Sequence, residues 1–251
     1  MAGHSKFKNT MHRKGAQDAK KSKLFGKIGR EITVATKAGG GDPNMNPRLR
    51  LAMATARVNS MPRDRIEKAV QNGLGLGDTS TYEEIRYEGY GPGGVAVIVE
   101  ALTDSRNRTA GDVRSTFSKY GGNLGETNSV SFMFDHKGEV IFPLSKGSAE
   151  AMFEAALEAG ADNVETDDES HRITCAPADF AAVREALLAK FGEPEKSGFV
   201  WIPNVQTTLD HEQAIAMMKL IDVLEDNDDV QHVTTNFEVS DEVMSKLVAA
   251  G

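Results

Sequence analysis

Apolar residues in the first quarter of the chain recur at helical spacing. Between Lys20 and Ala38 they fall on one face at ~100° per residue, which predicts an amphipathic helix. The residues that share this face are Leu24, Phe25, Ile28, Ile32 and Ala35. Glycines at 39–41, followed by Pro43, end the helix because neither residue type supports its continuation.

Two further helices are predicted before the pattern changes. Asn46 is a suitable N-cap and Pro47 a suitable first residue for a helix that runs to about Asn59. Pro62 opens a third helix, and Gly73 is its expected end. A glycine-rich stretch then follows, so the first domain is predicted to be helical and to end near residue 78.

Beyond residue 78 the apolar period alternates between that of strands and that of helices. The predicted strands cover residues 95–102, 129–134, 140–143, 163–165, 172–175, 199–202 and 230–239. The predicted helices cover residues 148–160, 180–191, 211–225 and a segment that Thr109 caps and that runs to Tyr120.

The order of these elements predicts an α+β protein of three domains. Residues 137–204 read as β-α-β-β-α-β, the split βαβ or ferredoxin-like arrangement. The elements on either side of it complement one another. We therefore expect a basic helical domain at 1–78, an α+β domain built from 79–136 plus 205–251, and the ferredoxin-like domain at 137–204 inserted in the second.

Charge is distributed unevenly between these parts. The first 73 residues hold 16 of the 29 Lys and Arg but five of the 37 Asp and Glu, a formal charge of +11. The remainder holds 13 basic and 32 acidic residues, a charge of −19, and the two sum to the chain's −8. Such asymmetry points to a polyanion as partner of the basic part, and nucleic acid is the expected one.

The basic part supplies the candidate binding residues. Lys23, Lys27 and Arg30 lie at i, i+4 and i+7, so their head groups project along ~10 Å of one helix side. Contacts of this kind with phosphates give affinity without base discrimination. The alternative is an ordinary solvated helix face. The whole predicted set is Lys6, Lys8, Arg13, Lys14, Lys20, Lys23, Lys27, Arg30, Arg50 and Arg57.

A second candidate is the loop at 103–109, which joins a strand to the start of a helix, where backbone N–H groups favour an anion. Arg106, Arg108 and Thr109 would form an anion-binding loop there. Alternatively the arginines pair with Asp104 or Asp112 and only fix the loop.

Catalytic and metal chemistry is not indicated. The six histidines have no ligand spacing, and Cys175 is the only cysteine, most simply a core residue. The G-x-G-x-x-G at 89–94 precedes a strand and contains Pro92, so it is read as a tight turn. The acidic run at 226–229 lacks the glycine and glutamate of a calcium loop and is read as a solvated turn. We expect no enzyme, no cofactor, no metal and no small-molecule substrate.

Several motifs of this chain resemble those of the YebC family of bacterial proteins, which includes the mitochondrial translational activator of cytochrome oxidase subunit one. They are AGHSKFKN, HRKGAQDAKKSKLF, REITVATKAGGGDPNMNPRLR, MPRDRIEKAV, YEGYGPGGVAVIVEALTDSRNRT and KYGGNLGETNSVSFMF. In the first motif Phe7 stands where the family usually has tryptophan. Met11 and Ser22 also depart from the family's pattern. The resemblance carries a polyanion-binding role onto Lys6, Lys8, Arg13, Lys14 and Lys20.

The resemblance implies a cytoplasmic protein of three domains, the third inserted in the second. It implies a DNA-binding regulator of transcription, or a ribosome-associated translation factor that binds ribosomal RNA or tRNA. We expect nucleic acid as the main partner, with protein partners for the two acidic domains. No stretch reaches the ~18 apolar residues of a membrane helix, so no membrane is expected.

Overall fold

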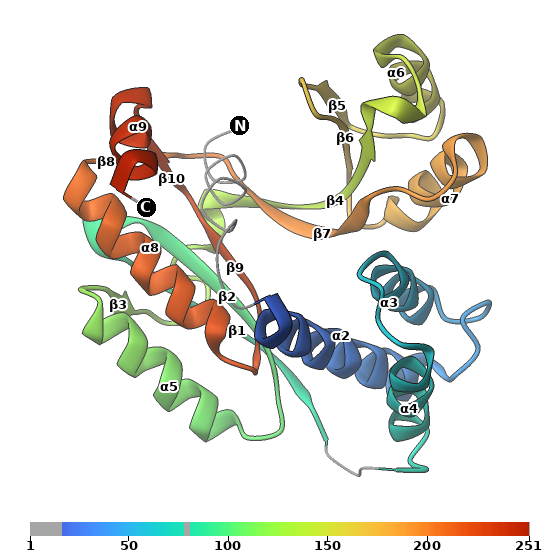
Figure 1. Cartoon of the computed structure of the whole chain (residues 1–251), viewed down its shortest axis with the longest axis horizontal. Helices are drawn as coiled ribbons and strands as arrows, with labels where there is room; N and C mark the ends of the chain where they lie inside the picture. The colour runs from blue at the N-terminus through green and yellow to red at the C-terminus, as the bar shows by residue number, and fades with distance from the viewer. Residues whose placement is uncertain (1–16, 78–80, 251) are drawn as a thin grey trace. The chain divides into compact units, whose positions relative to one another are not determined.

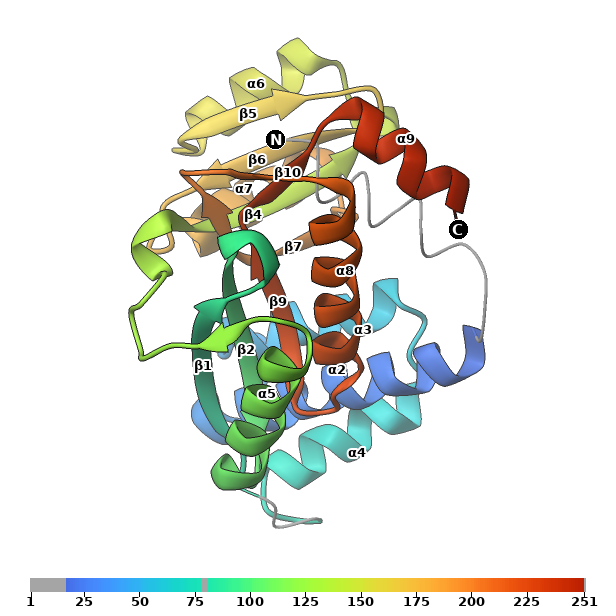
Figure 2. The ribbon, with the colours of Figure 1, turned by 90° about the vertical axis from the view of Figure 1, so that its left-hand side faces the viewer.

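The computed structural model describes residues 17–77 and 81–250, and it divides into two compact units. The first unit comprises the described parts of Met1–Glu31, Asp78–Phe134 and Pro203–Gly251. The second comprises Ile32–Gly77 and Asp135–Ile202. Both are drawn in Figures 1 and 2. The expected boundary near residue 78 lies outside the described residues, and the three-domain division stays a prediction.

The N-terminal part is helical, as predicted. Its helices are α2 (Gln17–Gly39), α3 (Pro47–Val58) and α4 (Arg63–Gly73). Gly40 follows α2 with φ of 85°, a left-handed conformation that ends a helix easily when the residue has no Cβ. Asn46 caps α3 by accepting a hydrogen bond from the Leu49 N–H at 3.0 Å, and its amide also donates to the Ala35 carbonyl at 2.8 Å. The cap thereby holds the start of α3 against the end of α2.

The third helix packs closely on α2. The Thr33 hydroxyl donates to the Ala69 carbonyl at 3.1 Å. A Cβ at Gly73 would lie 2.5 Å from the Thr36 Cβ, so this end of α4 has room only for glycine. The predicted apolar face of α2 is buried at Phe25, Ile28, Ile32 and Ala35, whereas Leu24 is 40% exposed and was wrongly assigned to it.

The first unit contains a four-stranded sheet of order β3-β1-β2-β9. Its strands are β1 (Glu83–Tyr90), β2 (Ala96–Thr103), β3 (Asn123–Leu124) and β9 (Val230–Thr235), and each neighbouring pair is antiparallel. Helices α5 (Arg106–Lys119) and α8 (His211–Asp226) lie side by side on one face of it (Figures 1 and 2). Alternate residues of β2 enter this core, beginning with Val95 just before the strand and continuing with Val97 and Val99.

Smaller elements complete the first unit. They are the 3-10 helices η1 (Pro92–Gly94) and η2 (Ser131–Met133), the parallel strands β8 (Thr207–Leu209) and β10 (Phe237–Val239), and helix α9 (Asp241–Ala250). The glycine-rich segment that includes η1 is the tight turn expected from the sequence, with φ of 73° at Gly93 and 76° at Gly94.

The second unit contains the predicted β-α-β-β-α-β element. It is formed by β4 (Phe134–Pro143), α6 (Ala149–Glu158), β5 (Asn163–Thr166), β6 (Ser170–Cys175), α7 (Phe180–Phe191) and β7 (Lys196–Pro203). The sheet order β5-β6-β4-β7 is that of the ferredoxin-like arrangement. The α+β class, with a helical N-terminal region and antiparallel sheets, is therefore confirmed.

Two boundary predictions were wrong for reasons visible in side-chain contacts. Residues 131–133 form η2 instead of a strand and only Phe134 of the predicted strand belongs to β4, because the Glu88 carboxylate accepts from the N–H groups of Val130 and Ser131, both at 2.9 Å. The predicted strand at 230–239 splits into β9 and β10 at the buried Asn236, whose side chain accepts from the Ala96 N–H at 2.8 Å.

One helix face and one helix start were also misassigned. On α6, Phe153 and Leu157 were expected in the core but are 54% and 65% exposed. Helix α5 begins at Arg106 with Ser105 as its N-cap residue, so Thr109 lies inside the helix and does not cap it.

Candidate nucleic-acid interface

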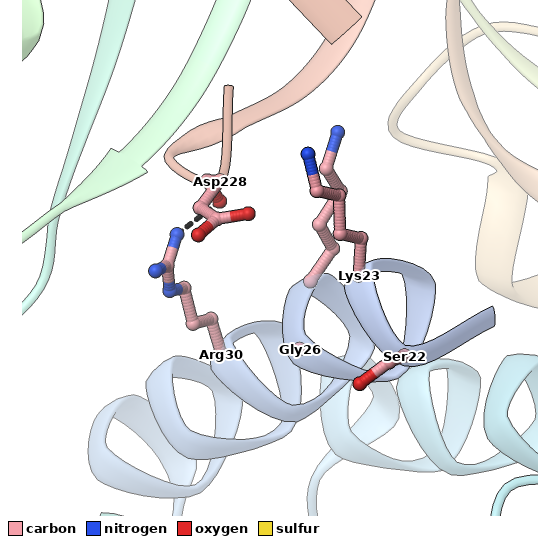
Figure 3. A pocket seen from close by; sticks show the side chains of 6 residues that line it. Ser22, Lys23, Gly26, Arg30 and Asp228 are labelled. Atoms are coloured by element: carbon pink, nitrogen blue, oxygen red, sulfur yellow. Dashed lines mark hydrogen bonds between the residues drawn. The ribbon is translucent and has the colours of Figure 1, made fainter. Parts of the chain in front are cut away.

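The three cations of α2 that were predicted to share one side do so. Lys23 and Arg30 project from the same side of the helix in Figure 3, and Lys27 lines the same pocket. The opposite, apolar side of α2 is buried at Phe25 and Ile28, which fixes the helix rotation.

These cations face the C-terminal end of α8 and the loop that leads to β9, a segment that we call the α8–β9 acidic segment and that comprises Glu225, Asp226, Asp228 and Asp229. The Lys23 ammonium donates to the Asp226 carboxylate at 2.5 Å and to its backbone carbonyl at 3.2 Å. The Lys27 ammonium donates to the Glu225 carbonyl at 2.7 Å. The last carbonyls of a helix have no partner within it, so this end of α8 attracts cations.

Arg30 also contacts this segment through two hydrogen bonds. Its guanidinium donates to the Asp228 carbonyl, the contact drawn as a dashed line in Figure 3, and to the Asp229 carboxylate at 3.1 Å. It also lies 5.6 Å from the centre of the Tyr82 ring, within the range of a cation–π contact.

A pocket of about 190 Å³ lies between α2 and the acidic segment. Its lining residues are Ser22, Lys23, Gly26, Lys27, Arg30 and Asp228. Burial lowers the pKa of Lys27 below its ordinary value, although the nearby acids, Glu225 first, oppose this shift. The pocket is thus lined by three basic side chains and one acidic residue.

Asp229 is the buried centre of this arrangement, with 5% of its surface exposed. Besides Arg30, its carboxylate accepts from the Thr109 hydroxyl at 2.7 Å, from Arg108 at 2.8 Å and from the Thr103 hydroxyl at 3.3 Å. Burial alone raises the pKa of Asp229, but the bonds from Arg108 and Thr109 and the two arginine charges lower it overall. Asp229 therefore joins α2, β2 and α5 as an ionised carboxylate.

The structure places the second predicted site around the same carboxylate. Arg108 pairs with Asp104 at 2.9 Å as well as with Asp229, so one of the two alternatives for this arginine, pairing with Asp104, is present. Thr109 is buried and bonded to Asp229, while Arg106 is exposed. Anion binding by this loop stays a prediction. Arg106 and Arg108 are both exposed, but Arg108 is already paired with two carboxylates.

The remaining predicted residues fall into three groups. Lys6, Lys8, Arg13 and Lys14 lie outside the described residues. Arg50 pairs with Glu185 of α7 and reaches the Pro43 and Asn44 carbonyls at 3.4 Å. Lys20 and Arg57 are exposed.

The acidic segment was missed as a partner of the basic stripe. The run at 226–229 was read as a solvated turn, which holds for Asp226 and Asp228 but is wrong for the buried Asp229. A signal was present, because four acids cluster where an amphipathic helix ends. The distance of about 200 residues between Arg30 and Asp229 hides the pairing from any local pattern.

Within residues 17–77 and 81–250 no group of three or more His, Cys, Asp or Glu side chains is arranged to hold a metal ion. Over the same described ranges, no helix combines the length and the apolar character that crossing a membrane requires.

The chain matches two family models and is similar to a solved structure. Residues 5–76 match the family model described as the TACO1/YebC protein N-terminal domain, and residues 82–237 match the one described as the TACO1/YebC second and third domain. The chain is also similar to a conserved hypothetical protein of Aquifex aeolicus whose crystal structure is known. The two share 43% sequence identity with a TM-score of 0.82, over 92% of this chain and 96% of that one.

Proposed function

This chain belongs to the TACO1/YebC family, and we propose that it is a nucleic-acid-binding regulator of gene expression that works by binding and not by catalysis. The observation that carries the proposal is the separation of charge, +11 over the first 73 residues against −19 over the rest. A polyanion is attracted to the first part and repelled by the second.

The helices of the basic part carry several exposed cations. The exposed ones are Lys20, Lys21, Lys37, Arg57, Arg63, Arg65 and Lys68. Lys23, Lys27 and Arg30 add a row of three on α2, although each also contacts the acidic segment. Duplex DNA carries one charge per ~1.7 Å of axis, so several phosphates lie within reach of one such helix.

Duplex DNA, and with it control of transcription, is the first proposed target. Structured RNA of the ribosome is the second, because the basic helices carry no motif known to read base edges. A-form RNA is recognised largely by shape and by phosphate contacts, which these cations could make equally well. The two acidic domains would contact protein partners, and the cytoplasm is the proposed location.

Cys175 and His171 are of residue types that often act in catalysis, but both are buried. Burial raises the pKa of Cys175 to about 11, so its thiol is protonated at neutral pH and is a poor nucleophile. His171 is buried, and its ring nitrogens are engaged by the Thr166 hydroxyl at 2.8 Å and the Gly147 carbonyl at 3.1 Å.

The test is the salt dependence of binding. Fluorescence anisotropy measures the affinity for a 20-base-pair duplex and for an RNA hairpin of similar length at several salt concentrations. For the duplex, a Lys20→Ala/Arg57→Ala variant should flatten the slope of log affinity against log salt by roughly 0.9 for each phosphate that the variant no longer neutralises. Replacing Lys23, Lys27 and Arg30 with Ala should flatten it as well.

A matched control removes two exposed cations of the acidic part, Arg114→Ala and Lys196→Ala. Its slope should equal that of the unmodified protein. Equal slopes for the control and for both test variants would contradict the proposal. Sedimentation of a cell lysate then separates the two targets, since a ribosome-bound factor travels with the ribosomes.

A further inference from the structure

We propose that the carboxylates of Asp226 and Asp228 compete with nucleic acid for the basic stripe of α2, so that binding requires the acidic segment to give way. This inference rests on the proposed function and adds a mode of regulation to it. It starts from the finding that Lys23, Lys27 and Arg30 all contact the segment at the end of α8.

The acidic segment resembles a phosphate backbone in the groups that it offers. A carboxylate and a phosphate both accept charge-assisted hydrogen bonds from ammonium groups at about 2.7–2.9 Å. The Lys23–Asp226 contact joins an ammonium group to a carboxylate in the same way, at 2.5 Å. The same side of α2 that suits a row of phosphates is thus occupied by a row of protein oxygens.

The pocket offers space for an entering anion. Its lining includes Gly26 and Ser22, and an added Cβ at Gly26 would meet no other atom within 4 Å. There is therefore unfilled space over Gly26, and Lys23 and Lys27 line the same pocket.

Two kinds of contact hold the segment, and they differ in how easily they open. The side chains of Lys23 and Asp226 are 41% and 73% exposed, and ion pairs this exposed contribute little to stability. Asp229 is buried and bonded to Arg108 and Thr109 from α5. We therefore expect Asp226 and Asp228 to be displaced while Asp229 keeps Arg30 in place.

The test compares three proteins in the anisotropy assay with the 20-base-pair duplex at about 0.1 M salt. The Asp226→Asn/Asp228→Asn variant removes the two competing charges but keeps the backbone carbonyls. A control, Asp112→Asn/Glu126→Gln, removes two exposed carboxylates elsewhere in the first unit. The first variant should bind roughly three- to tenfold more tightly than the control, the gain expected from removing the partly exposed Lys23–Asp226 pair and the attraction of the Asp228 charge for Lys27.

A second comparison excludes a general effect of net charge. Lys23→Ala should weaken binding more in the Asp226→Asn/Asp228→Asn background than in the unmodified protein, where Asp226 already engages Lys23. Circular dichroism melting shows that each variant is folded.

The outcomes separate the two proposals. If no variant binds duplex or RNA hairpin, the proposed function fails. If the unmodified protein binds but the Asp226→Asn/Asp228→Asn variant and the control have equal affinity, or Lys23→Ala has the same effect in both backgrounds, competition by the acidic segment is refuted and the proposed function stands.

Discussion

Two sets of basic residues on the N-terminal helices have different surroundings. On α2, Lys23, Lys27 and Arg30 contact the carbonyls and carboxylates at the end of α8. On α3 and α4, Arg57 and Arg63 are exposed, and Arg63 pairs with Glu67 of its own helix at 2.7 Å. The same kind of side chain therefore fixes the structure in one place and projects to solvent in the other, and only the structure distinguishes the two.

The largest predicted effect concerns Asp229, the buried carboxylate that Arg30 of the first set contacts. Asp229→Asn should lower the free energy of unfolding by about 2–3 kcal/mol, since it removes a buried carboxylate that accepts hydrogen bonds from Arg30, Arg108 and Thr109. Urea denaturation measures the change. A decrease below about 0.5 kcal/mol would mean that the bonds of Asp229 with Arg30, Arg108 and Thr109 do not stabilise the fold.

Acid should weaken the same contacts. The pKa of Asp229 and that of Glu88 are both below their ordinary values in the folded protein. Burial alone would raise both, but hydrogen bonds and arginine charges outweigh it. A lowered folded pKa adds stability that is present above the unfolded value of about 4 and is lost as the pH falls through the folded value.

If melting temperatures are measured between pH 6 and pH 2, they should therefore decrease once the pH is below about 4. The fall should be smaller in Asp229→Asn. An identical pH dependence in the two proteins would show that Asp229 titrates normally in the folded state.

Near the second set, we expect the uncharged Asn46 to stabilise helix α3 more than the exposed arginines do. Asn46→Ala removes the cap of α3 and the hydrogen bond to the Ala35 carbonyl, so the free energy of unfolding should decrease by about 1–2 kcal/mol. Asn46→Asp, which keeps the cap oxygen but loses the amide donor, is the informative companion. It should fall between Asn46→Ala and the unmodified protein in thermal denaturation.

The smallest effect is predicted for an exposed pair. Arg63→Ala breaks the Arg63–Glu67 ion pair, whose side chains are 91% and 58% exposed, and should change stability by no more than about 0.5 kcal/mol. A decrease as large as that of Asp229→Asn would erase the distinction between the two sets of basic residues.

The sequence predicted the local part of this architecture well. Capping by Asn46, the end of α2 at the glycines and the bounds of α7 follow from residues that are neighbours in the chain. The β-α-β-β-α-β order was also readable, since each of its elements has a regular apolar period.

What the sequence did not predict depends on polar side chains that act over long separations. Glu88 binds the backbone at Val130 and Ser131, and Asn236 binds that of Ala96, so neither follows from an apolar pattern. β1 was missed because its segment, EEIRYEGY, carries three glutamates and a glycine. For the candidate site, the charges were identified but their partners were not.

The most direct test of phosphate binding by the basic helices is acetylation footprinting of lysines by mass spectrometry, with and without a 20-base-pair duplex or an RNA hairpin. The account predicts that one of these nucleic acids protects Lys20, Lys23 and Lys27 on α2 from acetylation, while Lys119 and Lys196 in the acidic part react at unchanged rates. Equal protection of both groups of lysines, or protection of Lys119 and Lys196 alone, would contradict it.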